Sequence, residues 1–223
     1  EFNQLIGYTH GDTTAAYTYN ASGLRNSKTV NGVKTEFVWN GNNLVYEKTG
    51  TKENYYSYDM TGISNAKING TVTGYLKDSH GNVTAKTTAD GTVIKRYEYE
   101  AFGTEYGKTE NDTNPFRYCG EYYDSETGLI YLRNRYYDST LGRFISEDPA
   151  RDGTNWYVYC ENNPINYIDP LGLDAVLITS EHAALRQGHT SIITQHTRNG
   201  NWYYFYWGDK ATYFVEVPWK DGA

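Results

Sequence analysis

Residues 56–62 read Tyr-Ser-Tyr-Asp-Met-Thr-Gly, and this stretch decides the fold because it recurs along the chain. A close copy stands at 17–23 (Tyr-Thr-Tyr-Asn-Ala-Ser-Gly), and a looser copy stands at 97–103 (Tyr-Glu-Tyr-Glu-Ala-Phe-Gly). Weaker copies lie at 37–41 and 75–81. The residues that precede the Asn, Asp or Glu of these copies stand at positions 19, 39, 58, 77 and 99, so one copy follows another every 19–22 residues. Such a period is typical of repeat proteins, in which each unit packs against its neighbours.

Each copy predicts a strand followed by a tight turn. Alternate side chains of a strand share one face, so a Tyr-x-Tyr unit places both rings on the same side. The Asp or Asn that follows favours a turn because its side chain bonds the backbone ahead of it, and the closing Gly tolerates a positive φ. Asn31-Gly32 and Asn69-Gly70 are strong hairpin signals. Because a lone hairpin is marginal in water, we expect the units to stack on their neighbours.

The composition favours a mainly β protein. The 223 residues include 24 Tyr and 22 Gly but only 7 Phe, and this mixture argues against an all-helical fold. At about 150 residues per domain, the length predicts one or two domains. The net charge of −7 argues against a general nucleic-acid or anionic-membrane binder. No apolar run approaches the roughly 20 residues that are needed to span a bilayer.

The start of the chain and its cysteines set further expectations. The N-terminus, Glu1-Phe2-Asn3-Gln4, lacks the regions of a signal peptide and starts inside a repeat, so we take the chain as a fragment of a longer protein. Cys119 and Cys160 stand 41 positions apart without a CxxC partner. This argues against a disulfide framework or a zinc site, and it leaves two interpretations open, buried thiols or one optional bridge.

A second set of motifs lies between Asn114 and Leu173. In chain order they read Phe-Arg-Tyr-Cys-Gly-Glu-Tyr-Tyr-Asp (116–124), Gly-Leu-Ile-Tyr-Leu-Arg-Asn-Arg-Tyr-Tyr-Asp (128–138), Gly-Arg-Phe-Ile-Ser-Glu-Asp-Pro (142–149) and Asn-Pro-Ile-Asn-Tyr-Ile-Asp-Pro-Leu-Gly-Leu (163–173). This ordered set is similar to the Rhs-repeat-associated core domain. The shorter units resemble the YD repeats of Rhs proteins, of Tc-toxin C components and, more distantly, of teneurins. The resemblance covers residues 8–173.

The resemblance implies a fold and a division of the chain. Residues 1–113 are expected to form a YD-repeat β-sheet region, 114–173 a core domain that plugs the shell, and 174–223 a variable, truncated C-terminal effector segment. The expected fold class is mainly β, with stacked YD-repeat β-hairpins that form the end of a spiral β-shell, short helical turns near the core C-terminus and a small α+β tail. In this family the shell holds a partly unfolded toxin segment away from the producing cell.

The resemblance also implies self-cleavage just after the Asp-Pro-x-Gly-Leu motif, between Leu173 and Asp174. The paired aspartates of the family match Asp148 and Asp169. Either Arg143, which sits in the matching Gly-Arg-Phe motif, or Arg151 could hold one carboxylate charged or orient the pair. Two carboxylates that share a site cannot both ionise cheaply, so one keeps a proton while the other acts as base on water.

Two features depart from the family pattern. Arg151 stands where the usual pattern has Gly, and Asp148 and Asp169 stand 21 positions apart, one fewer than in familiar members. The alternative interpretation of both aspartates is structural, because Asp-Pro pairs form turns and Asp caps helices and turns without doing chemistry.

The tail from residue 174 changes character. A short helix is expected from Ser180 to Gly188, and strands are expected at 176–179, 188–195, 202–207 and 213–217. Gly188-His189 at the head of a strand resembles the opening of permuted papain-like domains, in which His189 would be the base that activates a Cys thiol. No cysteine follows Cys160, so this tail is not a complete cysteine enzyme. The other interpretation of His189 is a histidine that is hydrogen-bonded at a strand start.

The leading hypothesis is the C-terminal part of a bacterial Rhs/YD-repeat polymorphic toxin, which encapsulates a variable C-terminal toxin and releases it by aspartate-dependent self-cleavage. The implied partners are its own toxin segment and an immunity protein, without nucleic acid bound by the core and without a transmembrane segment. The implied location is secreted or at the bacterial cell wall or surface, and we expect neither cofactor nor metal. The alternative is a non-catalytic YD-repeat adhesion module, which needs neither aspartate.

Overall fold

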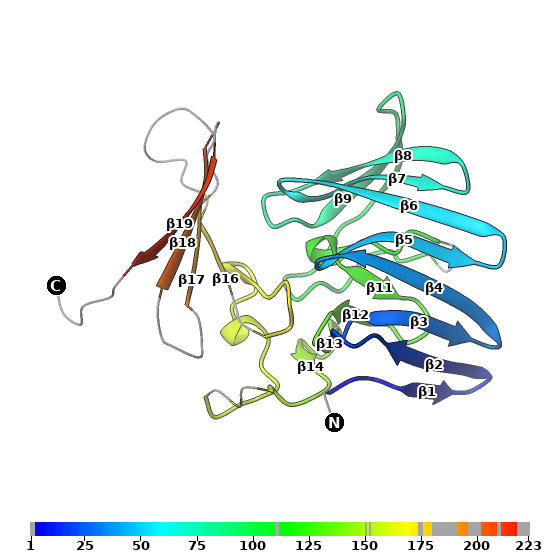
Figure 1. Ribbon diagram of the computed structural model, residues 1–223, viewed down its shortest axis with the longest axis horizontal. Helices are drawn as coiled ribbons and strands as arrows, with labels where there is room; N and C mark the ends of the chain where they lie inside the picture. The colour runs from blue at the N-terminus through cyan, green and yellow to red at the C-terminus, as the bar shows by residue number, and fades with distance from the viewer. Residues whose placement is uncertain are drawn as a thin grey trace.

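The repeats form one antiparallel sheet whose ten strands follow chain order. The computed structural model describes residues 3–109, 112–149, 151 and 153–173, and the backbone of four strands between 176 and 217. Figure 1 shows the strands stacked from β1 at the foot upward, which confirms the expected stack of hairpins. The bounds are β1 (Gly7–His10), β2 (Thr13–Tyr19), β3 (Arg25–Val30), β4 (Val33–Asn40), β5 (Asn43–Thr49), β6 (Lys52–Asp59), β7 (Gly62–Ile68), β8 (Thr71–Lys77), β9 (Val83–Thr88) and β10 (Val93–Arg96).

The tight turns of this sheet lie where the repeat predicts them, and its bulges follow the same period. Asn31-Gly32 joins β3 to β4 and Asn69-Gly70 joins β7 to β8, and all four residues have positive φ, as tight hairpin turns of this kind require. From β2–β3 to β8–β9, every second strand pair shifts its register inside the repeat unit, as between Thr18 and Tyr19 and between Ser57 and Tyr58. A bulge increases the twist of its strand, so these regular shifts curve the sheet.

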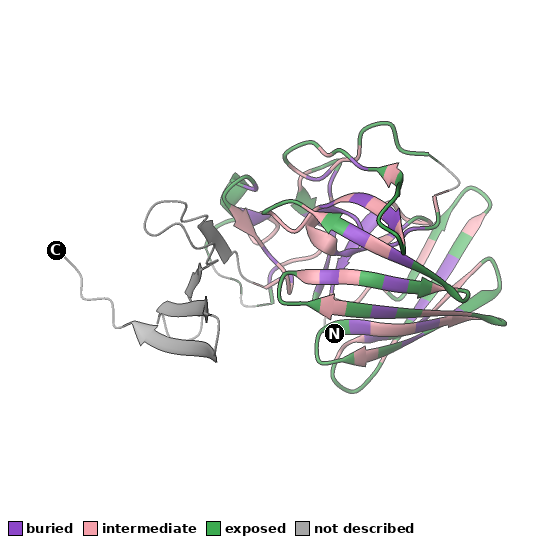
Figure 2. Cartoon of the chain, turned by 90° about the horizontal axis from the view of Figure 1, so that it is seen from above, coloured by how far each residue is buried: buried purple, intermediate pink, exposed green. Residues whose placement is uncertain are grey.

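The first aromatic ring of each unit points to one face of the sheet. Tyr17, Phe37 and Tyr56 are only 3–5% exposed, whereas the residues beside them face solvent, and Figure 2 shows this alternation along the strands. The second ring is partly buried, and its polar tip donates to a backbone carbonyl 14–16 residues earlier. These bonds join Tyr19 to Leu5, Trp39 to Arg25, Tyr58 to Leu44 and Tyr99 to Val83. Each unit is therefore tied to the chain before it.

Residues 114–173 pack against the ring-bearing face. They contain a sheet with the order β11 (Tyr122–Asp124), β12 (Leu129–Leu132), β13 (Arg135–Asp138) and β14 (Arg143–Phe144), and two short helical turns, η1 (Tyr118–Gly120) and η2 (Cys160–Asn162). One hydrophobic cluster joins rings of the first sheet to Phe116, Tyr122, Tyr131 and Tyr136. The repeats and the core domain therefore share one hydrophobic cluster, and a second cluster of buried residues lies within the core domain.

A buried ion cluster strengthens this contact. Arg25 of β3 and Asp124 of β11 are both 0% exposed and form an ion pair. Lys28 Nζ lies 2.9 Å from Asp124 Oδ1 and 3.0 Å from Glu126 Oε2. Burial acts to raise the pKa of Asp124, but Arg25 and Lys28 outweigh it and hold this pKa below its usual value. Asp124 therefore stays ionised and ties the core to the sheet.

A third sheet has the order β15–β16–β17–β18–β19. β15 (Tyr167–Ile168) stands just before the Asp-Pro-Leu-Gly-Leu motif and pairs with the first strand after it, β16 (Val176–Thr179). The others are β17 (Ser191–Gln195), β18 (Trp202–Gly208) and β19 (Ala211–Val217). The four expected tail strands are present, and the helix expected over 180–188 lies outside the described residues. In the described part of the chain, no helix is long and apolar enough to cross a membrane.

Candidate functional site

The candidate site is built on the tight turn between β12 and β13. Arg133 and Asn134 form this turn, with Arg133 in the left-handed region (φ 61°) and Asn134 N 2.7 Å from Leu132 O. The run from 129 to 137 is otherwise apolar or aromatic, so the turn with its following residue, Arg135, places two cationic side chains and an amide at one edge of the core.

The segment Asp169–Leu173 lies on this turn. Asn134 donates to Leu171 O through its backbone N (3.3 Å) and through its Nδ2 (2.9 Å). Arg133 Nη1 donates to Pro170 O (3.0 Å). Successive carbonyls of the segment are therefore held by successive residues of the turn.

Gly172 makes the closest approach to the turn. Its φ is 66°, and a Cβ at this position would lie 2.9 Å from Leu132 O and 3.0 Å from Arg135 N. Arg135 Nε donates to Gly172 O (2.5 Å). Only glycine combines this φ with this approach, which explains the residue type at this place in the motif.

Asp169 is a buried carboxyl beside a cation. It is 3% exposed, and Arg135 Nη2 lies 3.5 Å from its Oδ2, while its Oδ1 accepts a hydrogen bond from Leu173 N (3.0 Å). Burial raises the pKa of Asp169 to about 7, and the Arg135 charge and the backbone N–H groups oppose that rise only in part. Near neutral pH this carboxyl can therefore give or take a proton, as acid–base chemistry requires.

Asp148 approaches the same site through Trp156. It is 8% exposed, and its backbone N donates to Trp156 O (2.8 Å). Arg135 Nη1 donates to the same carbonyl oxygen (3.2 Å). The backbone of Asp148 is therefore linked to Asp169 through Trp156 O and the Arg135 guanidinium, and the pairing of the two carboxyl groups stays a prediction.

Arg135 is a candidate site residue that the sequence analysis did not single out. It is 4% exposed, and its guanidinium lies 3.6 Å from the centroid of the Phe144 ring. The sequence-predicted arginine, Arg143, is exposed and lies over the ring of Tyr157 (4.9 Å), so its catalytic role stays a prediction. A signal for Arg135 does exist, because an arginine inside a run of buried residues needs a partner for its charge.

Four other positions that the sequence analysis named can be compared with the structure. Leu173 is partly buried, whereas Asp174 and His189 lie outside the described residues. Arg151, which stands where the family pattern has Gly, has a φ of 53°, in the region that favours glycine, and it pairs with Glu147 (3.5 Å). Arg151 therefore adopts the left-handed backbone conformation that is favoured by glycine, the residue of the family pattern at this position.

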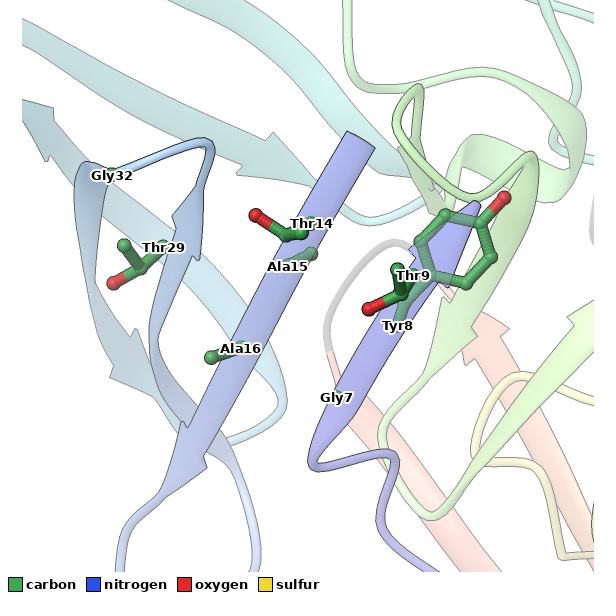
Figure 3. Close-up of a pocket in the computed structure, with 8 residues that line it drawn as sticks. All are labelled: Gly7, Tyr8, Thr9, Thr14, Ala15, Ala16, Thr29 and Gly32. Atoms are coloured by element: carbon green, nitrogen blue, oxygen red, sulfur yellow. The ribbon is translucent and has the colours of Figure 1, made fainter. Parts of the chain in front are cut away.

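Elsewhere in the described residues, no candidate matches this site. Cys119 and Cys160 are free thiols, and burial raises both of their pKa values, which favours the unreactive protonated form. No group of three or more His, Cys, Asp or Glu suited to a metal ion is found among the described residues. A depression of about 380 Å³ over β1, β2 and β3, shown in Figure 3, is lined by small residues such as Gly7, Ala16 and Gly32 and by no charged group.

Comparison with known proteins finds several relatives. Residues 75–165 match the family model described as Teneurin YD-shell. The chain is 34% identical over 189 residues to the tRNA3(Ser)-specific nuclease WapA of Bacillus spizizenii, a match that covers 78% of this chain and 8% of that protein. It is 32% identical over 200 residues to double-stranded DNA deaminase toxin A of Burkholderia cenocepacia, over 73% of this chain and 14% of that protein. The chain thus spans a small part of the length of these relatives.

Among solved structures, the chain is similar to the crystal structure of TcdB2-TccC3-Cdc42. The TM-score is 0.59 at 23% identity, over 73% of this chain and 9% of that chain. A sequence identity this low supports similarity of fold only. The structural similarity agrees with the stacked sheet and the core domain packed against it.

Proposed function

The chain is a YD-repeat protein of the Rhs type, and from this premise we propose that it is the plugged end of a shell that encloses a C-terminal toxin. In this proposal residues 1–113 are a piece of the shell wall, 114–173 are the plug, and 174–223 are the start of the toxin. The plug cuts the chain after Leu173, which frees the toxin from the shell.

The placement of Asp169 is the single observation that carries this proposal. Its carboxyl is buried, its pKa is close to neutral, and its Oδ1 lies 3.0 Å from the backbone N of Leu173. Chain cleavage at neutral pH needs a group that holds a proton near the bond to be cut, and most surface aspartates have lost theirs. A turn-capping Asp would gain nothing from a raised pKa.

The proposed reaction is hydrolysis by two carboxyl groups, one of which acts as base and the other as acid. Asp148 takes a proton from a water molecule, and the oxygen of that water attacks the carbonyl carbon of Leu173. The C–N bond to Asp174 breaks as Asp169 gives its proton to the leaving nitrogen. The products are a new carboxyl group at Leu173 and a new amine at Asp174. Arg135 acts as a positioning residue, because it contacts both Asp169 and Gly172 O.

Intact mass measured before and after denaturation tests this proposal. We expect the purified wild-type chain to separate on denaturation into one piece that ends at Leu173 and one that begins at Asp174. Asp169→Asn keeps the shape of the side chain and its bond to Leu173 N but cannot donate a carboxyl proton, so this variant stays whole. Asp90→Asn, at an exposed turn, is the matched control and is cut like the wild type. One uncut mass for all three proteins would favour the non-catalytic adhesion module.

The relatives support a toxin whose activity varies. One is a tRNA nuclease and another is a DNA deaminase toxin, so relatives that match more than two thirds of this chain differ in what they act on. In this proposal the protein is secreted or held at the bacterial surface, and the partners of its toxin segment are the shell itself and an immunity protein.

A further inference from the structure

Arg133 links the wall of repeats to the segment that contains the cleavage motif. Its Nε donates to Asn42 O (3.1 Å), in the turn between β4 and β5, and its Nη1 donates to Pro170 O (3.0 Å). The same guanidinium forms an ion pair with Glu121. One side chain therefore joins a repeat turn, an acid of the core and the carbonyl that directly follows Asp169.

Burial and charge favour this arrangement. The side chains of Arg133 and Glu121 are 12% and 9% exposed. Burial raises the pKa of Glu121, and the charge of Arg133 opposes that rise, so the guanidinium lowers the cost of an ionised buried carboxyl. A guanidinium suits three acceptors in different directions because its N–H groups diverge in one plane, which a lysine ammonium on a flexible stem does not reproduce.

A cavity of about 250 Å³ adjoins this link. Arg133, Glu121 and Asn42 are among the residues that line it, together with Pro170-Leu171 of the motif. A water molecule occupies about 30 Å³ of liquid, so a cavity of this size can admit a small cation to the place that the guanidinium fills.

We infer that Arg133 is a positioning residue for self-cleavage, and that it makes cutting depend on the docking of the wall turn at Asn42. This inference rests on the proposed function. Arg135 and Asn134 hold the segment to the core hairpin, whereas Arg133 also ties it to a repeat. A core whose wall is misplaced loses this restraint on Pro170 O, and displacement of a reacting group by about 1 Å can cost about 100-fold in rate. Cutting after Leu173 therefore depends on the docking of the repeat turn at Asn42 against the core.

Chemical rescue of Arg133→Gly in the full 223-residue chain tests this inference. Glycine tolerates the φ of 61°, so the turn keeps its shape while the guanidinium is removed. The measurement is the rate at which the 174–223 piece appears by intact mass after refolding, with methylguanidinium or methylammonium at concentrations too low to unfold the protein. We expect cleavage to slow about 10-fold or more and methylguanidinium, but not methylammonium, to restore part of the rate.

Two further variants serve as controls for the unpaired charge of Glu121 and for the loss of an arginine elsewhere. Arg133→Gly leaves the buried carboxylate of Glu121 without its cation. The double variant with Glu121→Gln removes that unpaired charge. It should be cut as slowly as Arg133→Gly, and methylguanidinium should again restore part of the rate. Arg96→Ala removes an exposed arginine of β10 and should cut at the wild-type rate without a response to methylguanidinium.

The outcomes separate this inference from the proposed function. A wild-type chain that is cut, with Arg133→Gly cut equally fast, overturns the inference and leaves the proposed function standing. Slow cleavage that methylguanidinium does not restore, in both the single and the double variant, shows a merely structural role and also overturns it. A wild-type chain that is never cut overturns both the proposed self-cleavage and the inference about Arg133.

Discussion

Asp169 binds its proton more tightly in the folded chain than in the unfolded chain. Its pKa rises from 3.8 to about 7 because burial disfavours the charged form. A group whose folded pKa is raised contributes stability that is fully present below the unfolded pKa and is lost as the pH rises through the folded pKa. The contribution of Asp169 is therefore present below about pH 4 and lost by the time the pH passes 7.

Asp169→Asn should remove this pH dependence. We compare two chains that both carry Asp148→Asn, so that neither is cut, one with Asp169 intact and one with Asp169→Asn. The chain with Asp169 should lose stability relative to the other between pH 4 and pH 7, by up to about 4 kcal/mol. Urea unfolding at pH 4, 5.5 and 7.5 measures the difference, and parallel stability curves would contradict the raised pKa.

Gly172→Ala and Gly153→Ala form a matched pair. Both glycines have φ near 66°, but a Cβ at Gly172 meets backbone atoms at 2.9 and 3.0 Å, whereas a Cβ at Gly153 meets nothing within 4 Å. Each substitution costs about 1 kcal/mol for the left-handed backbone, and Gly172→Ala should cost about 1–3 kcal/mol more for the clash. Urea unfolding checks the stabilities, and cleavage should slow for Gly172→Ala alone. Equal effects at the two sites would show that the approach of Gly172 to the turn does not matter.

The site was predictable from sequence at some residues and not at others. Asp148 and Asp169 each stand in an Asp-Pro motif, so local sequence marks them. The partnership of Arg135 with Asp169 depends on how the β12–β13 hairpin meets a distant loop, and no local pattern encodes that contact. Arg143 looked equally suitable on charge alone, and only the fold separates a buried arginine from an exposed one.

At the scale of the strands, the predictable features are the local ones. The Asn-Gly turns form as expected because their residues tolerate positive φ, whatever surrounds them. The burial of Arg25 was not predictable, because its strand reads Arg-Asn-Ser-Lys-Thr-Val and looks solvated on both faces. Its partner Asp124 stands 99 residues away, so this contact is a property of the tertiary fold.

The ion pair between β3 and β11 should be strongly coupled. Arg25→Met leaves Asp124 buried with less positive charge around it and should cost about 3–5 kcal/mol, and adding Asp124→Leu should recover part of this loss. Lys34 and Glu36, whose ion pair lies exposed at 2.7 Å, provide the control. A double-mutant cycle by urea unfolding should find coupling for the buried pair and none that is measurable for the exposed pair. Similar coupling in the two cycles would argue that burial does not decide the strength of the first pair.

At the scale of the whole molecule, the repeats and residues 114–173 share buried side chains and form one folding unit. The rings of Tyr17, Phe37 and Tyr56 pack against Tyr136, Tyr122 and Phe116 respectively. Arg25 forms its ion pair with Asp124 of the same segment. Residues 1–113 alone would expose a broad aromatic face and a stranded cation, both of which destabilise a soluble sheet. The boundary expected after residue 113 therefore marks a change of sequence motif, whereas residues on both sides of it belong to the same hydrophobic cluster.

Separate expression of residues 1–113 and 114–173 should show this dependence. Each piece alone should bind a hydrophobic dye and lack a cooperative thermal transition, because neither can bury its share of the common cluster. Mixing the two should give a 1:1 complex by native mass spectrometry with a single cooperative transition. Arg25→Met in the first piece should weaken the complex at least 10-fold, as the loss of one partner of a buried charge pair implies, whereas Lys34→Met should not. A first piece that unfolds cooperatively by itself, at the melting temperature of the joined chain, would show that the repeats stand without the plug.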